Sequence, residues 1–181
     1  LPSRESIDGV GVHRVWSLPS ARGKLSARVL GDLGFSVAAS LALFRLARRG
    51  DVVVAKTDPP LILVPAGWVA RRRGAWIVNW LQDVFPEVAA ELGVKLARGL
   101  AGRLLCWLRN RSVRRASANV VVGRLMRERV AALGVDPRTI AIIPNWADGA
   151  ALRPVAPGAN ALRAEWGIGD RFVVGYSGNM G

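Results

Sequence analysis

Short polar side chains follow four apolar runs of the sequence, each of which predicts a β-strand. They are Lys56–Asp58, Gln82–Asp83, Asn145 and Ser177–Asn179. Ligands of an open parallel sheet bind beyond the carboxyl ends of its strands, so we expect these residues to share one edge. Carboxylates and amides of this kind recognise sugar hydroxyl groups. Each cluster alone is better explained by helix capping or turn formation, but four in succession favour a binding site.

Gln82 and Asp83 are the leading catalytic candidates. A carboxylate at a sheet edge can accept the proton of an acceptor hydroxyl, or orient that hydroxyl. Asp83 can also cap a short helix that begins at Pro86, with Glu87 in its first turn. The two roles are compatible.

Several other kinds of site are disfavoured. His13, the one histidine, has no carboxylate at a recognisable spacing, so we expect it to be structural or to face solvent. Cys106, the one cysteine, is expected to be a buried apolar residue of a helix. The two cannot build a zinc site, and no metal or cofactor is expected. The glycine motifs of P-loop NTPases, dinucleotide oxidoreductases and α/β-hydrolases are absent.

Alternating strands and helices are predicted to position these residues. The run 51–55 is continuous and β-branched, which is typical of a strand covered on both faces. Short links between strands and helices predict a doubly wound, Rossmann-like parallel sheet. The predicted strands are 10–16, 51–55, 75–80, 119–122 and 139–143, and the predicted helices are 25–49, 61–73, 96–116 and 123–133.

A domain boundary is predicted near Pro144–Asn160, which is rich in proline and lacks periodicity. A short helix at 161–166 and a strand at Phe172–Tyr176 are expected to follow. We therefore divide the chain into an incomplete first domain at 1–148, a linker with a short helix at 149–170, and the beginning of a second domain at 171–181. A sheet that begins so close to Gly181 indicates a piece of a longer protein.

The net charge of +13, carried mostly by arginine, predicts a polyanionic partner. Basic residues fill the predicted helix 96–116, and Arg71–Arg73 lie close to Trp68 and Trp76. Arginines beside tryptophans suit peripheral attachment to an anionic membrane, whereas no nucleic-acid module is recognisable. The uncharged stretch Leu33–Phe44 is shorter than the roughly 20 residues of a spanning helix. Neither a signal peptide nor a membrane span is expected. The residues predicted to face the membrane are Arg71, Arg72, Arg73, Arg103 and Arg111.

The motifs around Lys56–Pro60, Trp80–Glu87 and Ile143–Asp148, followed by Tyr176–Gly181, resemble those of family 4 glycosyltransferases. The closest likeness is to the bacterial exopolysaccharide, colanic-acid-type branch. The resemblance implies a GT-B architecture, with an acceptor-side domain here and a donor-side domain that begins near Gly181. Gln82 stands where many relatives carry a histidine, so an imidazole role is not carried over.

The resemblance also implies the function and its residues. A sugar would pass from a nucleotide-sugar to a lipid-linked or oligosaccharide acceptor, with retention, at the cytoplasmic face of the membrane in exopolysaccharide synthesis. The 181-residue chain alone is expected to be inactive. A non-catalytic basic module that binds membrane or nucleic acid, and a GT-B sugar-nucleotide epimerase, stay open as alternatives. The implied acceptor ligands are Lys56, Thr57, Asp58, Glu87 and Asn145, and the implied donor ligands are Ser177, Gly178, Asn179 and Gly181.

Overall fold

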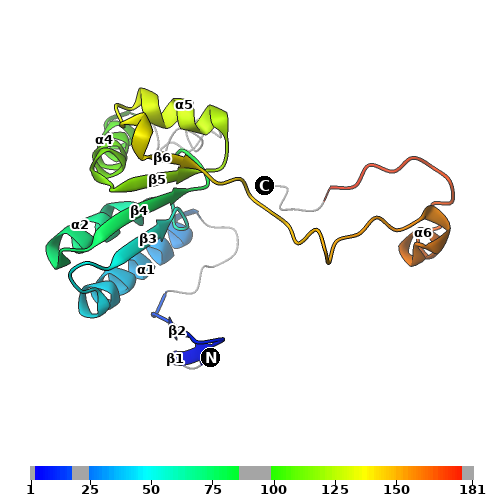
Figure 1. The fold of residues 1–181 in the computed structure, drawn as a ribbon, viewed down its shortest axis with the longest axis horizontal. Coiled ribbons are helices and arrows are strands. Elements are labelled where there is room, and N and C mark those ends of the chain that lie inside the picture. Colours follow the sequence, from blue (N-terminus) through cyan, green and yellow to red (C-terminus); the bar gives the residue numbers. More distant parts are fainter. Residues whose placement is uncertain (1–2, 18–24, 86–98, 177–181) are drawn as a thin grey trace. The chain divides into compact units, whose positions relative to one another are not determined.

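The structure is a computed structural model that describes residues 3–17, 25–85 and 99–176 (Figure 1). The chain divides into two compact units, Leu1–Pro144 and Asn145–Gly181. Glu87, Ser177, Gly178, Asn179 and Gly181, which were predicted to bind acceptor or donor, lie outside the described residues.

A parallel sheet of four strands forms the centre of the first unit (Figure 1). Its strands follow one another in chain order, β3-β4-β5-β6, because each leads through a helix to its immediate neighbour. The valine-rich runs suit an extended backbone, since β-branched side chains pack well on a pleated surface. The strands are β3 (Val52–Lys56), β4 (Trp76–Leu81), β5 (Ala118–Val121) and β6 (Ile140–Ile142).

The helices bury the hydrophobic core against one face of this sheet. Ala55, Ile77 and Val121 project from that face and join one buried cluster with Leu63 of α2 and Val130 of α5. When each right-handed crossover leads to the next strand on the same side of the previous one, the connecting helices all lie on the same face of the sheet. The predicted Rossmann-like α/β fold is confirmed. The helices of this unit are α1 (Leu25–Leu46), α2 (Leu63–Arg73), α4 (Gly99–Arg115) and α5 (Arg124–Ala132), and a 3₁₀ turn, Pro137–Thr139, precedes β6.

Gly74 sets the link from α2 to β4. It adopts a left-handed conformation with φ of 67°, and its N–H caps the helix by donating to the carbonyl groups of Ala70 and Arg71. A side chain at this position would be strained and would meet Arg49 Cγ at 3.2 Å. The glycine therefore fixes the point at which β4 starts.

The prediction that strand 51–55 is covered on both faces is wrong. Val52 and Val54 are 62% and 55% exposed, and Trp76 beside them on β4 is 61% exposed. Val53 and Ala55 alternate with them and face the helices instead. A run of valines cannot reveal this difference, because the same residues suit a strand with one covered face or two.

A β-hairpin near the beginning of the chain was only half predicted. β1 (Arg4–Ile7) pairs in antiparallel register with β2 (Val10–His13), and the link has positive φ at Asp8 and Gly9. This Asp-Gly pair is a strong hairpin signal. The first predicted strand begins at residue 10, so β1 was not predicted. His13 is exposed at the end of β2, as expected.

α1 differs from the expectation of no membrane-spanning segment. Its window Val29–Leu46 has a mean hydropathy of 1.6 and is only 6% buried. By length and composition α1 is therefore a candidate span, the one such helix among the described residues. The uncharged stretch Leu33–Phe44 ends at Asp32 and Arg45, but a helix of this length tolerates both charged residues within it.

The second unit contains a 3₁₀ turn (Pro157–Ala159) and the short helix α6 (Ala161–Glu165). Asn160 caps α6 by accepting hydrogen bonds from the N–H groups of Leu162 and Arg163. The strand predicted at Phe172–Tyr176 is not formed, and Phe172 is 93% exposed. A strand needs a neighbour to pair its backbone groups, and the described part of the chain provides none here.

Candidate active site at the carboxyl ends of β3 and β4

The register of the two neighbouring strands brings the first two polar clusters together. Lys56 pairs with Trp80 in the β3–β4 ladder, so Thr57 and Asp58 leave the sheet at the level of Leu81 and Gln82. Both strands run in the same direction, and their carboxyl ends therefore share one edge. The predicted juxtaposition of Lys56–Asp58 with Gln82–Asp83 is confirmed.

Thr57 connects the loop that follows β3 to the loop that follows β4. Its side chain is buried, and its N–H donates to the Trp80 carbonyl at 3.1 Å. Its Oγ1 accepts from the Gln82 N–H at 3.0 Å, and its hydroxyl is hydrogen-bonded to the Asp83 carboxylate. These contacts fix the backbone at Gln82 and one oxygen of Asp83. Thr57 is placed to position Asp83 and not to contact an acceptor in the solvent-facing part of the site.

Asp83 is half-buried and chemically distinct from an exposed aspartate. Its Oδ1 is buried and has no hydrogen-bond partner in the described ranges. Burial raises the pKa of the carboxyl group, the hydrogen bond from Thr57 lowers it in part, and the nearby charge of Asp58 raises it. A raised pKa makes the carboxylate a stronger base, which suits removal of a hydroxyl proton.

The space beneath this cluster is too small for a sugar. A cavity of about 10 Å³ lies among Thr57, Asp83, Leu63 and the buried Arg109. A volume of that size holds about one water molecule. Lys56 and Asp58 are exposed and Gln82 is half-buried, so an acceptor would approach from their side.

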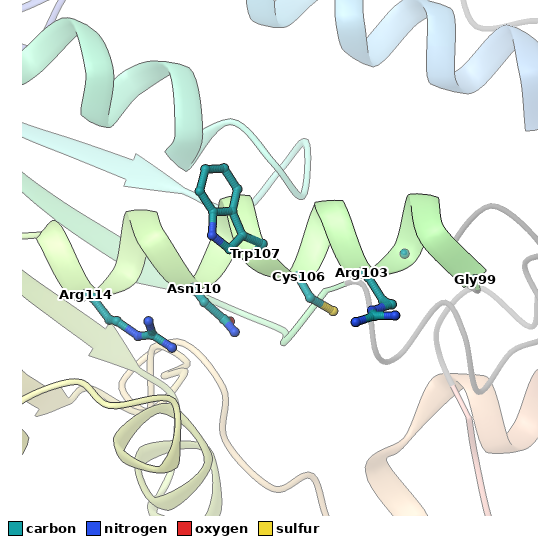
Figure 2. A pocket seen from close by; sticks show the side chains of 7 residues that line it. Gly99, Arg103, Cys106, Trp107, Asn110 and Arg114 are labelled. Carbon is teal, nitrogen blue, oxygen red and sulfur yellow. The ribbon is translucent and has the colours of Figure 1, made fainter.

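A larger open hollow of about 410 Å³ runs along α4 (Figure 2). All of its lining residues belong to that one helix, and none belongs to the cluster of Lys56, Thr57, Gln82 and Asp83. Figure 2 shows Arg103, Asn110 and Arg114 on one side of the helix and Trp107 on the other. Cys106 is half-buried at this hollow and not fully buried as expected. The residues that line it are Gly99, Gly102, Arg103, Cys106, Trp107, Asn110 and Arg114.

The predicted membrane-facing arginines are separate from the catalytic candidates. Arg71, Arg72, Arg103 and Arg111 are exposed on α2 and α4. Arg73 is half-buried, and its Nε donates to the Ala47 carbonyl at 2.9 Å just beyond α1. It therefore has a structural role in addition to its charge.

The prediction that Asn145 joins this cluster stays a prediction, because Asn145 belongs to the other compact unit. Asn145 begins the second unit and is exposed. Within the described ranges, no group of three or more histidine, cysteine, aspartate or glutamate side chains could hold a metal ion. The site consists of Lys56, Asp58, Gln82 and Asp83, with Thr57 as support.

Comparison with known proteins agrees with this fold. The glycosyl transferase 4-like domain family matches residues 1–146, and the chain belongs to that family. The resemblance to family 4 glycosyltransferases is thus confirmed, whereas the colanic-acid-type branch stays a prediction. One relative is a protein named probable glycosyltransferase WbjE from Pseudomonas aeruginosa, 35% identical over 170 residues. That match covers 90% of this chain but only 40% of the relative, so the chain spans about two fifths of its length.

Proposed function

We propose that this chain supplies the acceptor side of a glycosyltransferase that moves a sugar from a nucleotide-sugar to a lipid-linked or oligosaccharide acceptor. The process that it serves is the synthesis of a bacterial exopolysaccharide or other cell-surface polysaccharide. The observation that carries the proposal is the half-buried Asp83 carboxylate at a sheet edge, held by Thr57 beside the exposed Lys56 and Asp58. Membership of the glycosyltransferase family supports the class of reaction.

In the proposed reaction, an acceptor hydroxyl oxygen attacks the anomeric carbon of the donor sugar. The new glycosidic C–O bond forms as the bond from that carbon to the donor phosphate breaks, and the nucleoside phosphate leaves with the bonding pair. Asp83 orients the hydroxyl and accepts its proton. The raised pKa of this carboxyl group favours that transfer over one to an ordinary exposed aspartate.

The neighbouring side chains provide complementary contacts. Gln82 offers both an amide donor and a carbonyl acceptor for sugar hydroxyls, and Asp58 offers a second carboxylate. Lys56 contributes a cation that suits a phosphate of a lipid-linked acceptor. Positioning of this kind lowers the barrier because the reacting groups no longer have to find each other in solution. The donor would be held by Ser177–Gly181 and residues beyond this domain.

The test is a transfer assay with the full reading frame that encodes this chain. Radiolabelled nucleotide-sugars are supplied one at a time together with polyprenyl-phosphate-linked sugars or soluble oligosaccharides. We expect label to pass into an acceptor fraction in at least one pairing, and the coupling constant of the new linkage would report whether configuration is retained. Conversion of a nucleotide-sugar to its epimer without acceptor labelling would favour the epimerase alternative. Absence of any turnover across the panel would contradict the proposal.

A further inference from the structure

The apolar face of α1 is directed to solvent and not to the core. We call Leu30, Leu33, Val37, Leu41 and Phe44 the α1 stripe. Their spacing of three or four residues places them on one side of the helix, and each is between 41% and 61% exposed. At about 1.5 Å per residue the stripe extends for roughly 20 Å. Monomeric soluble proteins seldom expose so large an apolar surface, which marks it as an interaction site.

The C-terminal end of α1, including Phe44 of the stripe, packs on the domain. Leu43 contacts the hydrophobic core and Ala47, just beyond the helix, is buried. The Phe44 ring stacks with Trp68 of α2 at a centroid distance of 6.5 Å. A helix that is held by α2 along one side cannot be surrounded by lipid. This packing favours a helix that lies along a membrane surface over one that crosses it, despite its apolar composition.

Arginines and aromatic rings meet at the end of the stripe. The guanidinium of Arg72 lies 4.8 Å from the Trp68 ring centroid, and that of Arg73 lies 5.2 Å from the Phe44 ring centroid. Tryptophan rings and arginine stems are typical of the layer between lipid headgroups and acyl chains, because each has an apolar body and a polar end. The arrangement matches the boundary of a bilayer.

A cluster of positive charge extends from α2 to α4. Burial lowers the pKa of Arg71, and repulsion from Arg115 and Arg111 of α4 lowers it further. Within the described parts of the chain, no carboxylate forms an ion pair with Arg71, Arg72 or Arg111. Clustered cations without neighbouring carboxylates are stabilised by contact with an anionic surface. A second copy of the chain would instead bring another set of arginines toward them.

We propose that the α1 stripe and the adjoining arginines of α2 form a docking surface for an anionic phospholipid bilayer. α1 lies in the plane of the interface, with the stripe inserted among the acyl chains and Arg71 and Arg72 at the phosphate groups. The proposal does not depend on which sugar or acceptor the protein uses. It assigns the apolar part of the membrane contact to α1, a helix that the charge pattern alone did not point to.

The test is sedimentation of the 181-residue chain with vesicles of phosphatidylcholine and phosphatidylglycerol in a three-to-one ratio. The decisive variant replaces Leu30, Leu33 and Leu41 of the stripe by glutamate. Its matched control replaces Leu125, Leu152 and Leu162, which are 79%, 67% and 52% exposed, by glutamate. Each variant replaces three leucines and gains three negative charges. Circular dichroism verifies that each keeps the wild-type fold.

We expect the stripe variant to lose at least tenfold in vesicle affinity and the control less than threefold. In low salt, the double variant with Arg71→Gln and Arg72→Gln should bind vesicles more weakly than the control double variant with Arg124→Gln and Arg129→Gln. The wild-type chain should bind only weakly to vesicles of phosphatidylcholine alone. Equal binding by the stripe variant and its control would overturn the proposal. So would a dimer that forms without lipid and that the stripe variant abolishes, or wild-type protein that resists extraction from the vesicles by alkaline carbonate.

Discussion

The Asp83 carboxylate combines the two conditions that the proposed catalytic base requires. It is sheltered enough for its pKa to be raised, and it lies beside the exposed side chains Lys56 and Asp58 at the open edge of the sheet. A fully buried carboxylate would not reach a hydroxyl, and a fully exposed one would lack the basicity. Thr57 holds the backbone of Gln82, and Asp83 is the next residue. This position gives Asp83 both the partial burial and the access to the open edge.

Replacing Asp83 by asparagine is expected to reduce sugar transfer about a hundredfold or more, because an amide cannot accept the proton. The assay measures kcat and KM of the full reading frame with its acceptor. Asp170→Asn serves as the control, since Asp170 is exposed in the second unit and its charge is lost in the same way. A D83N enzyme with kcat within threefold of wild type would exclude Asp83 as the base.

Thr57 should act through Asp83, and its effect should be visible in the pH dependence. Its hydrogen bond lowers the carboxyl pKa, so Thr57→Val removes that effect and the pKa rises further. The base is then protonated up to a higher pH, and the acidic limb of the kcat/KM profile moves to higher pH. Thr57→Ser keeps the hydroxyl and should restore the wild-type limb. If the valine variant loses activity equally at all pH values, Thr57 is only structural.

At the scale of elements, a pair of buried asparagines joins β4, β5 and α4. Asn79 Nδ2 donates to Asn119 Oδ1 at 3.1 Å, and Asn119 Nδ2 donates to the Val113 carbonyl at 2.9 Å. Both side chains are fully buried. The pair holds β4 and β5 in the register that carries Gln82 and Asp83 to the edge beside Thr57.

Asn119→Ala should lower the free energy of unfolding by about 2 kcal/mol, because it leaves Asn79 Nδ2 and the Val113 carbonyl buried without this partner. Urea denaturation followed by circular dichroism gives the value. Ser40→Ala is a suitable control, since the Ser40 hydroxyl only bonds to the Ser36 carbonyl of its own helix. A difference below about 0.5 kcal/mol between the two variants would show that the pair contributes specificity and not stability.

The sequence was informative where local chemistry decides the structure. The valine runs predicted β3 and β5, and the polar residues after β3 and β4 predicted a shared edge, because parallel strands leave a sheet together. The contacts of Thr57 could not be predicted, since they depend on register between strands. The sequence likewise predicted a helix over 25–49 but not what its apolar side chains contact, because their spacing is the same whether they meet a core or a membrane.

At the scale of the whole molecule, the two units differ in how their residues are held. The first has a buried core formed by its sheet and helices. In the second, none of the described residues is buried, and the apolar side chains of Leu152, Trp166 and Phe172 are largely exposed. Without burial, little free energy opposes the conformational entropy of the chain. The second unit should therefore open to a protease before the sheet does.

Brief digestion by trypsin should cut after Arg171 before it cuts after Arg71, Arg72 or Arg73. Arg171 is exposed in a segment without regular structure, whereas the three arginines of α2 lie at the end of a helix packed on the core. Backbone that is neither buried nor hydrogen-bonded in an element is the preferred site of cleavage. Mass spectrometry of the early fragments identifies the order. Arg171→Gln should move the early cut to Arg163 and leave the α2 sites protected, whereas early cutting within α2 would show that the first unit lacks the stability that its core implies.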